Sequence, residues 1–215
     1  LRAKAKGLLQ GLEAEVNLVL DVMLPTERVV DALRAFREAF PTVTLRLYVE
    51  GLGAVTQMVL DRAATLGVAG PLEVVHGGDE LDYIAVGSTV LIPVAASDHP
   101  LAQGANPPGA GRGHTQLVLT DRSRLTEGRD FAVASAHTWR LADLGAKHLL
   151  LKEGFGWGNM PEPMVRDDLA AGRLKRLAMP DLKEAIYPLH AVYRTDTPPG
   201  PATAFLIERF RGQAG

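Results

Sequence analysis

Hydrophobic and polar positions along this chain follow two periods in turn, one near two that indicates strands and one near 3.6 that indicates helices. Val16–Met23 is an apolar run rich in β-branched residues and predicts a buried strand, and Val43–Val49 alternates like a second strand. Between them, Thr26–Phe40 predicts an amphipathic helix, with Val29, Val30, Leu33, Phe36 and Phe40 on one face and Glu27, Arg28, Asp31, Arg34 and Arg37 facing away. A helix at Ala54–Ala64 and a short strand at Gly67–Ala69 complete a β-α-β-α-β order, which favours a parallel sheet with helices on both faces.

The second half of the chain repeats this α/β plan. The strands expected there are Val90–Ala95, Gln116–Thr120, Asp130–Ser135 and Ile186–Arg194, and the last helix is Pro201–Arg211. The composition of Gln103–Gly113, rich in Gly and Pro, predicts a loop.

The segment Leu144–Leu177 has the clearest signals for where helices and strands begin and end. A helix at Leu144–Glu153 has Asp143 as its expected N-cap, and three glycines then allow a tight reversal into a short strand. Pro161 fits the first turn of a second helix, which Gly172 ends before Arg173–Leu177 resumes as a strand. This order is typical of an open α/β sheet and says little about chemistry.

Composition adds limits to this picture. The chain has 215 residues, enough for one domain or two subdomains, and its net charge of −2 gives no argument for nucleic-acid binding. Cysteine is absent, which removes disulfides, thiol catalysis and cysteine-ligated metal. The first 16 residues have no apolar run long enough for a signal peptide or a membrane span, and without an initiator Met we expect a fragment or a processed chain.

Residues with catalytic or metal-binding potential are scattered. The Gly154, Gly156 and Gly158 spacing is not that of a dinucleotide-binding loop, and no P-loop or nucleophile elbow occurs. The histidines form no ligand pair with a nearby Glu; they are His76, His99, His114, His137, His148 and His190. The sequence therefore predicts no enzyme, no metal site and no cofactor, and we expect Trp139 and Trp157 to be packing residues.

Asp21 is the one carboxylate inside an apolar strand, so it must be paired, hydrogen-bonded or close to water. Two interpretations stay open: a strand-end residue satisfied by local amides, and a residue of a binding cleft. Asp143 has a similar choice between N-cap and ligand contact, and it can be both.

A ligand of an open α/β sheet binds beyond the carboxyl ends of its strands. The residues that this rule selects are Asp21, Met23, Leu24, Thr26, Gly51, Leu52, Gly70, Thr120, Asp121, Ala142 and Asp143. Several of these loops end at helix N-termini, which favour an anionic group, whereas Met23 and Leu24 offer apolar walls. We therefore expect a small organic acid, with a neutral or amphipathic molecule as the alternative.

Five segments in order resemble the effector-binding domain of LysR-type transcriptional regulators. They are Val16–Pro41, which resembles the family's first strand and first helix and ends in its F-x-x-x-[FY]-P signature at Phe36–Pro41; Thr42–Leu52; LGVAGPL at 66–72; LIPVAASDHPL at 91–101; and the segment 144–177. The chain departs from the pattern at Thr65, where many relatives carry Asp, and at Gly70, where some relatives place a ligand-binding Arg.

The resemblance implies a periplasmic-binding-protein-like fold of type 2, in which two Rossmann-like subdomains are joined by a two-crossover hinge near Pro93 and Pro188. It implies a linker-helix remnant at 1–13, subdomain I at 14–93 plus 188–215, and subdomain II at 94–187. The effector would bind in the cleft between subdomains, at the loops selected above, and change how an N-terminal helix-turn-helix domain, absent from this chain, binds DNA. It further implies a cytoplasmic homodimer, or a tetramer in a full-length regulator, without membrane contact.

Two other classes share this bilobal fold. A solute-binding protein of a transporter would need an export signal, which the sequence does not show. An enzyme, such as a transferase or a dehydratase, would need clustered acid, base or nucleophilic groups, and the carboxylates here are dispersed.

Overall fold

The computed structural model describes residues 12–71, 78–182 and 184–212, and the contacts divide the chain into two compact units. Unit 1 consists of residues 1–88, 121–127 and 188–215, and unit 2 of residues 89–120 and 128–187. The predicted residue bounds of the two subdomains stay a prediction, and the linker helix expected at 1–13 falls almost wholly outside the described residues.

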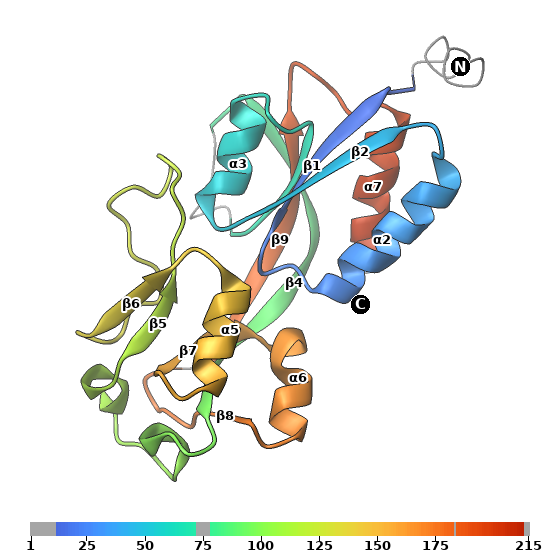
Figure 1. Ribbon diagram of the computed structural model, residues 1–215. Coiled ribbons are helices and arrows are strands. Elements are labelled where there is room, and N and C mark those ends of the chain that lie inside the picture. Colours follow the sequence, from blue (N-terminus) through green and yellow to red (C-terminus); the bar gives the residue numbers. More distant parts are fainter. Residues whose placement is uncertain (1–11, 72–77, 183, 213–215) are drawn as a thin grey trace. The chain divides into compact units, whose positions relative to one another are not determined.

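Unit 1 is built on a sheet with the strand order β2-β1-β3-β9-β4. The first strand pairs in parallel with both β2 and β3, whereas β9 runs antiparallel to β3 (Figure 1). The chain therefore moves from β1 to one side for β2 and returns past β1 for β3, which is the reversal of a doubly wound sheet. Its elements are β1 (Glu15–Asp21), α2 (Thr26–Ala39), β2 (Thr44–Glu50), α3 (Gly53–Leu60), β3 (Leu66–Ala69), β4 (Leu81–Ala96, which continues into unit 2), β9 (Ala185–Arg194, which enters from unit 2) and α7 (Pro201–Gly212).

Helix α3 lies close against the sheet because Gly67 has no side chain. A Cβ atom at Gly67 would lie 2.7 Å from the Val192 side chain and 3.0 and 3.1 Å from Val55 and Val59. These valines form one fully buried cluster with Val19 of β1. The apolar residues that the sequence pattern assigned to this helix thus anchor it to the strands whose ends it follows.

Helix α2 was expected in the right place, but its buried face is rotated. Ala32 and Phe36 are buried, whereas Val30 is 46% exposed. Arg28, expected to face away, is half-buried and donates hydrogen bonds from Nη2 to the carbonyl oxygens of Val86 and Phe210, at 2.5 and 2.6 Å. A guanidinium can be partly buried when it donates hydrogen bonds to main-chain carbonyls. The prediction that Arg28 faces away, which relied on its charge, was therefore wrong.

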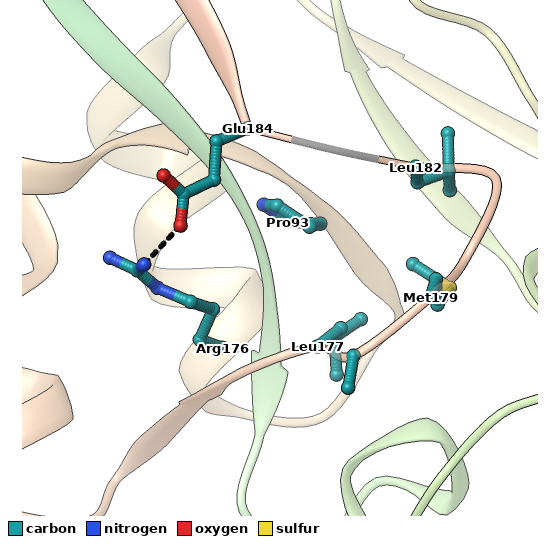
Figure 2. A pocket seen from close by; sticks show the side chains of 7 residues that line it. Pro93, Arg176, Leu177, Met179, Leu182 and Glu184 are labelled. Carbon is teal, nitrogen blue, oxygen red and sulfur yellow. Dashed lines mark hydrogen bonds and ion pairs between the residues drawn. The ribbon is translucent and has the colours of Figure 1, made fainter.

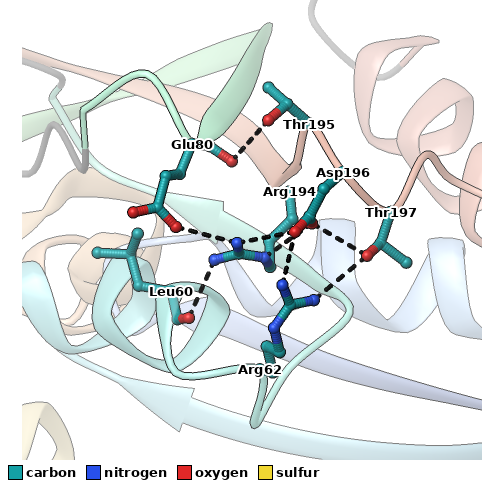
Figure 3. Close-up of polar contacts among 7 residues, drawn as sticks. All are labelled: Leu60, Arg62, Glu80, Arg194, Thr195, Asp196 and Thr197. Carbon is teal, nitrogen blue, oxygen red and sulfur yellow. Dashed lines mark hydrogen bonds and ion pairs between the residues drawn. The ribbon is translucent and has the colours of Figure 1, made fainter.

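The C-terminal end of α3 is tied to β9 by a network of charged side chains (Figure 3). Arg194 donates to the carbonyl oxygen of Leu60 at 3.1 Å and to the carboxylates of Glu80 and Asp196. Asp196 also accepts a hydrogen bond from Arg62 at 2.5 Å, and the two arginines hold the pKa of its carboxyl well below the usual range. The network fixes the return of the chain into unit 1.

Unit 2 has the strand order β4-β7-β5-β6, with β8 on the other side of β4. Strand β5 is parallel to β6 and β7, and β4 is antiparallel to β7 and β8. Its core includes the fully buried Trp157, whose Nε1 donates to the carbonyl oxygen of Gly111 at 3.1 Å, as expected for a packing residue. The further elements of this unit are β5 (Gln116–Leu119), β6 (Thr138–Leu141), α5 (Leu144–Lys152), β7 (Trp157–Pro161), α6 (Glu162–Ala170), β8 (Leu174–Arg176) and two short 3-10 turns, Pro100–Ala102 and Ala110–Gly113.

Three sequence predictions are wrong. No strand forms at Asp130–Ser135, which lies in irregular structure. Strand β4 begins at Leu81, nine residues before the predicted start at Val90. Trp139 is 48% exposed on β6, where its ring lies 5.6 Å from that of Phe155, so it is not a core residue.

Candidate functional site

The carboxyl ends of β1, β2 and β3 lie at one edge of the unit 1 sheet. Asp21, the last residue of β1, is paired in register with Glu50 of β2, and Leu20 with Val68 of β3. Each of these strands therefore delivers its following loop to the same edge. The loops contain Met23, Leu24, Gly51, Leu52 and Gly70, whereas Thr26 starts α2 and is exposed.

Asp21 closes the turn after β1. It is 1% exposed, and its Oδ1 accepts a hydrogen bond from the Met23 amide at 2.8 Å. Its carbonyl oxygen accepts from Leu24 at 2.9 Å. The interpretation of Asp21 as a strand-end residue satisfied by local amides is thus supported by these contacts, and they also fix the buried Met23 and Leu24 at the sheet edge.

Helix α3 starts at this edge from a strained residue. Leu52 has a φ of +49° and is 8% exposed. The Ala54 amide in the first turn donates to Asp121 Oδ2 at 2.9 Å, and Thr126 donates to the other oxygen of the same carboxylate. Asp121 therefore occupies the helix N-terminus that the sequence offered to a ligand anion.

The segment 121–127 packs on α3 through the missing side chain of Gly53. A Cβ atom there would lie 2.3 Å from Ser123 Oγ, 2.9 Å from the Thr126 methyl group and 3.2 Å from Leu125 Cβ. Sequence reasoning selected Asp121 as a ligand contact, but no pattern showed that a segment between two strands of unit 2 belongs to unit 1.

His190 lies beside the end of β3. It is paired in register with Ala69, and its Nδ1 is 3.4 Å from the carbonyl oxygen of Gly70. The histidine is half-buried, so it adds a polar group to the edge that carries Gly70.

In unit 2 the carboxyl ends of β5 and β6 are likewise neighbours. The Thr120 amide, after β5, donates to the carbonyl oxygen of Leu141 at 2.8 Å. Ala142 and Asp143 follow β6, and Asp143 Oδ1 accepts the Ala146 amide at 2.5 Å, which confirms it as the N-cap of α5. The N-termini of α3 and α5 are thus capped by carboxylates of the chain itself, whereas α2 follows Pro25 without a side-chain cap.

Lys147 is a buried charged residue that was not predicted from the sequence. It lies on the buried face of α5, is 3% exposed, and donates from Nζ to the carbonyl oxygen of Asn159 at 2.7 Å. Burial lowers the pKa of its ammonium from 10.5 to about 8. The available signal was its spacing, because Leu144, Lys147 and Leu151 recur on one face of the helix.

A separate hollow of about 390 Å³ lies in unit 2 beside β4 and β8 (Figure 2). Pro93, Leu177, Met179 and Leu182 give it apolar walls. Its cation, Arg176, is already held by the carboxylates of Glu184 and Glu162. An anion would therefore have to compete with two ion pairs there.

The described part of the chain shows no group of three or more His, Asp or Glu side chains that could hold a metal ion. None of its helices has the length and apolar character that a membrane crossing needs.

The chain was also compared with known protein families, curated proteins and solved structures. The family model described as the LysR substrate binding domain matches residues 9–215. A search of curated proteins gave no match.

Solved structures share the fold at low sequence identity. The effector-binding domain of QuiR in complex with shikimate is 13% identical, with a TM-score of 0.72 and coverage of 94% of this chain and 97% of that one. The Synechocystis PCC6803 CcmR regulatory domain in complex with 2-PG is 14% identical, with a TM-score of 0.74 and coverage of 93% and 97%. The regulatory domain of CrgA, a LysR-type transcriptional regulator from Neisseria meningitidis, is 15% identical, with a TM-score of 0.70 and coverage of 94% and 100%. These likenesses confirm the expected periplasmic-binding-protein-like α/β fold.

Proposed function

This chain belongs to the LysR substrate-binding domain family, and on that basis we propose that it senses a small-molecule effector for a transcriptional regulator. The effector binds at the carboxyl-terminal edges of the parallel strands. The observation that carries the proposal is the grouping of strand-end residues within each unit. Asp21 ends β1, and Gly51 and Gly70 follow β2 and β3 of unit 1; Thr120 and Asp143 come after the neighbouring strands β5 and β6 of unit 2.

These edges suit a ligand on physical grounds. Parallel strands present unpaired main-chain groups at their ends, and a doubly wound sheet separates the loops at its switch point. Structures of the same fold carry shikimate in QuiR and 2-PG in CcmR, which supports a small organic acid as the effector class. Since Asp121 and Asp143 cap α3 and α5, these two helix N-termini do not supply the positive charge that such an acid would bind.

The proposal extends to the regulator as a whole. The domain acts without catalysis, in the cytoplasm, as a homodimer, or as a tetramer in a full-length regulator. DNA contact belongs to a helix-turn-helix domain, since the net charge of −2 gives this domain no basic surplus. The family match favours this function over that of a transporter's solute-binding protein.

A thermal-shift screen with metabolites tests the proposal, because a ligand that binds the folded state raises the unfolding temperature. Thr120→Trp blocks the carboxyl-terminal edge of unit 2, and Thr138→Trp places the same bulk at the opposite end of the neighbouring strand. We expect a metabolite to stabilise the wild type and Thr138→Trp but not Thr120→Trp. Equal stabilisation of the wild type and both variants would show that the ligand does not bind at the carboxyl-terminal edge of unit 2. Leu52→Glu is a poor probe because Leu52 is buried in a strained turn.

A further inference from the structure

Lys147 carries a positive charge at the switch point of the unit 2 sheet. In the order β7-β5-β6, the chain passes from β5 to β6 on one side and then to β7 on the other, so the order reverses between β5 and β7. Ligands of doubly wound sheets bind at this kind of reversal, beyond the carboxyl ends of the strands. The bond from Lys147 to Asn159 of β7 places the ammonium beside this reversal.

The hydrogen bond of Lys147 fixes this placement. The described pairing of β5 with β7 is Gln116 with Trp157, and it does not continue to Asn159. The carbonyl oxygen of Asn159 instead accepts Nζ of Lys147 at 2.7 Å. Gly158 leaves room for the lysine stem, since a Cβ atom there would lie 3.1 Å from Lys147 Cε. The ammonium thus donates to a main-chain carbonyl of β7, at the middle residue of the strand Trp157–Pro161.

The ammonium has no carboxylate partner among the described residues. Its hydrogen bond to Asn159 uses one of three N–H groups. It also lies near the N-terminal end of α5, where the helix dipole disfavours a positive charge. A buried cation with one neutral acceptor is costly to the fold, and an anion would compensate it.

The neighbouring charged groups leave this charge uncompensated. Strands β5 and β7 contribute no titratable side chain. Arg140 of β6 is paired with Asp130, and Asp143 caps α5 at its own N-terminus. His148 and Lys152 of α5 both face Asp168 of α6, at 2.6 and 3.8 Å.

We propose that Lys147 is the specificity-determining cation of the effector site and binds an oxyanion of the effector, a carboxylate, phosphate or sulfonate group, at the β5–β7 switch point. This inference rests on the proposed function. Lys147 would supply the positive charge that the capped N-termini of α3 and α5 do not offer to an anion. The pKa of the ammonium, about 8 when the site is empty, rises when an anion is bound, so binding takes up a proton near pH 8.

The test uses sulfate and acetate as oxyanion probes and acetamide as the neutral probe, at constant ionic strength. Lys147→Gln removes the charge but keeps a hydrogen-bond donor, and Lys175→Gln removes an equal charge from an exposed position of unit 2. Sulfate and acetate should raise the unfolding temperature of the wild type and Lys175→Gln, with dissociation constants about tenfold or more tighter than in Lys147→Gln. Acetamide should have no such effect.

A measurement on the wild type alone removes any dependence on the variant's folding. The pKa of Lys147, followed by NMR of its side-chain nuclei, should rise on addition of sulfate. The inference is overturned if that pKa does not change, if the wild type does not respond to either anion, or if Lys147→Gln keeps the full response. A neutral metabolite that binds Lys147→Gln as tightly as the wild type would also overturn it and leave the proposed function standing. If sulfate stabilises the wild type through Lys147 but no metabolite binds, the inference stands and the proposed function fails.

Discussion

Two side chains of unit 2 hold ionisable groups away from water, and each makes stability depend on pH. Lys147 lies under α5, and His99 starts the 3-10 turn at Pro100–Ala102, where its Nδ1 accepts the Leu101 amide at 3.1 Å. Both are bases whose pKa is lower in the folded chain than in the unfolded chain. In both cases the unfolded state binds more protons between the two pKa values, so the free energy of unfolding rises with pH in that window.

For Lys147 the window runs from about pH 8 to pH 10.5, and the full cost of the buried charge is present at pH 7. Lys147→Met removes about 3 kcal/mol of that cost and leaves the Asn159 carbonyl without a donor, at about 2 kcal/mol. We expect the variant to be about 1 kcal/mol more stable at pH 7 and less stable than the wild type above pH 10.5. Urea unfolding at both pH values measures this, with Lys175→Met as the exposed control. A less stable variant at pH 7 would contradict the prediction.

His99 makes stability depend on pH in the acidic range. Burial lowers the pKa of its imidazole first, and the neighbouring His114 adds to the effect. Stability should therefore fall as the pH drops below 6.5. His99→Asn keeps an acceptor for the Leu101 amide and removes the titration, so its unfolding temperature should fall less between pH 7 and pH 5. His137→Asn, at an exposed position, should behave like the wild type. The idea fails if His99→Asn follows the wild-type curve.

At the scale of elements, the sequence was informative where caps and periodicity agreed. Helix α5 follows its N-cap Asp143, and α6 lies between Pro161 and Gly172 as expected. The strand expected at Asp130–Ser135 failed because local β propensity was not matched by a pairing partner. The face of α2 was misplaced because Arg28 finds its acceptors in β4 and α7, which are distant in the sequence.

The same limit explains what was missed at the candidate site. Strand-end loops follow from topology, so Met23, Gly51 and Thr120 could be named from the sequence. The contact of Asp121 with α3 joins residues 67 positions apart, and the bond from Lys147 to Asn159 exists only where two strands stop pairing. Neither contact has a periodic signal.

The packing of residues 121–127 on α3 makes a prediction for Gly53. Alanine normally stabilises a helix relative to glycine by about 1 kcal/mol, but here its Cβ would meet Ser123 and Leu125. Gly53→Ala should therefore destabilise the protein by about 1–3 kcal/mol. Gly212→Ala, in the open last turn of α7, should stay within about 0.5 kcal/mol of the wild type. Denaturant unfolding compares the two, and a stabilised Gly53→Ala would show that the segment does not lie on α3.

At the scale of the whole molecule, both units repeat one plan, a sheet whose strand order reverses beside its first parallel strand. Unit 1 also exposes apolar side chains on its edge strand: Leu47, Tyr48 and Val49 of β2 are 43%, 37% and 56% exposed. An unpaired edge with apolar residues is a candidate interface.

We expect a dimer at tens of micromolar, a rough scale for such interfaces. Val49→Lys places a charge on the exposed edge of β2 and should shift sedimentation towards the monomer without lowering the unfolding temperature of the monomer. A wild type that sediments as a monomer, or a variant that dimerises equally well, would reject the edge as an interface.

The central claim is that the effector binds at the carboxyl-terminal edges of the parallel strands. The most direct test is amide chemical-shift mapping with a metabolite that stabilises the protein. The account predicts the largest shifts at Met23, Gly51, Gly70, Thr120 and Asp143, with little change at the amino-terminal edge near Thr44 and Gln116. Shifts confined to the hollow around Arg176, Met179 and Leu182 would contradict it.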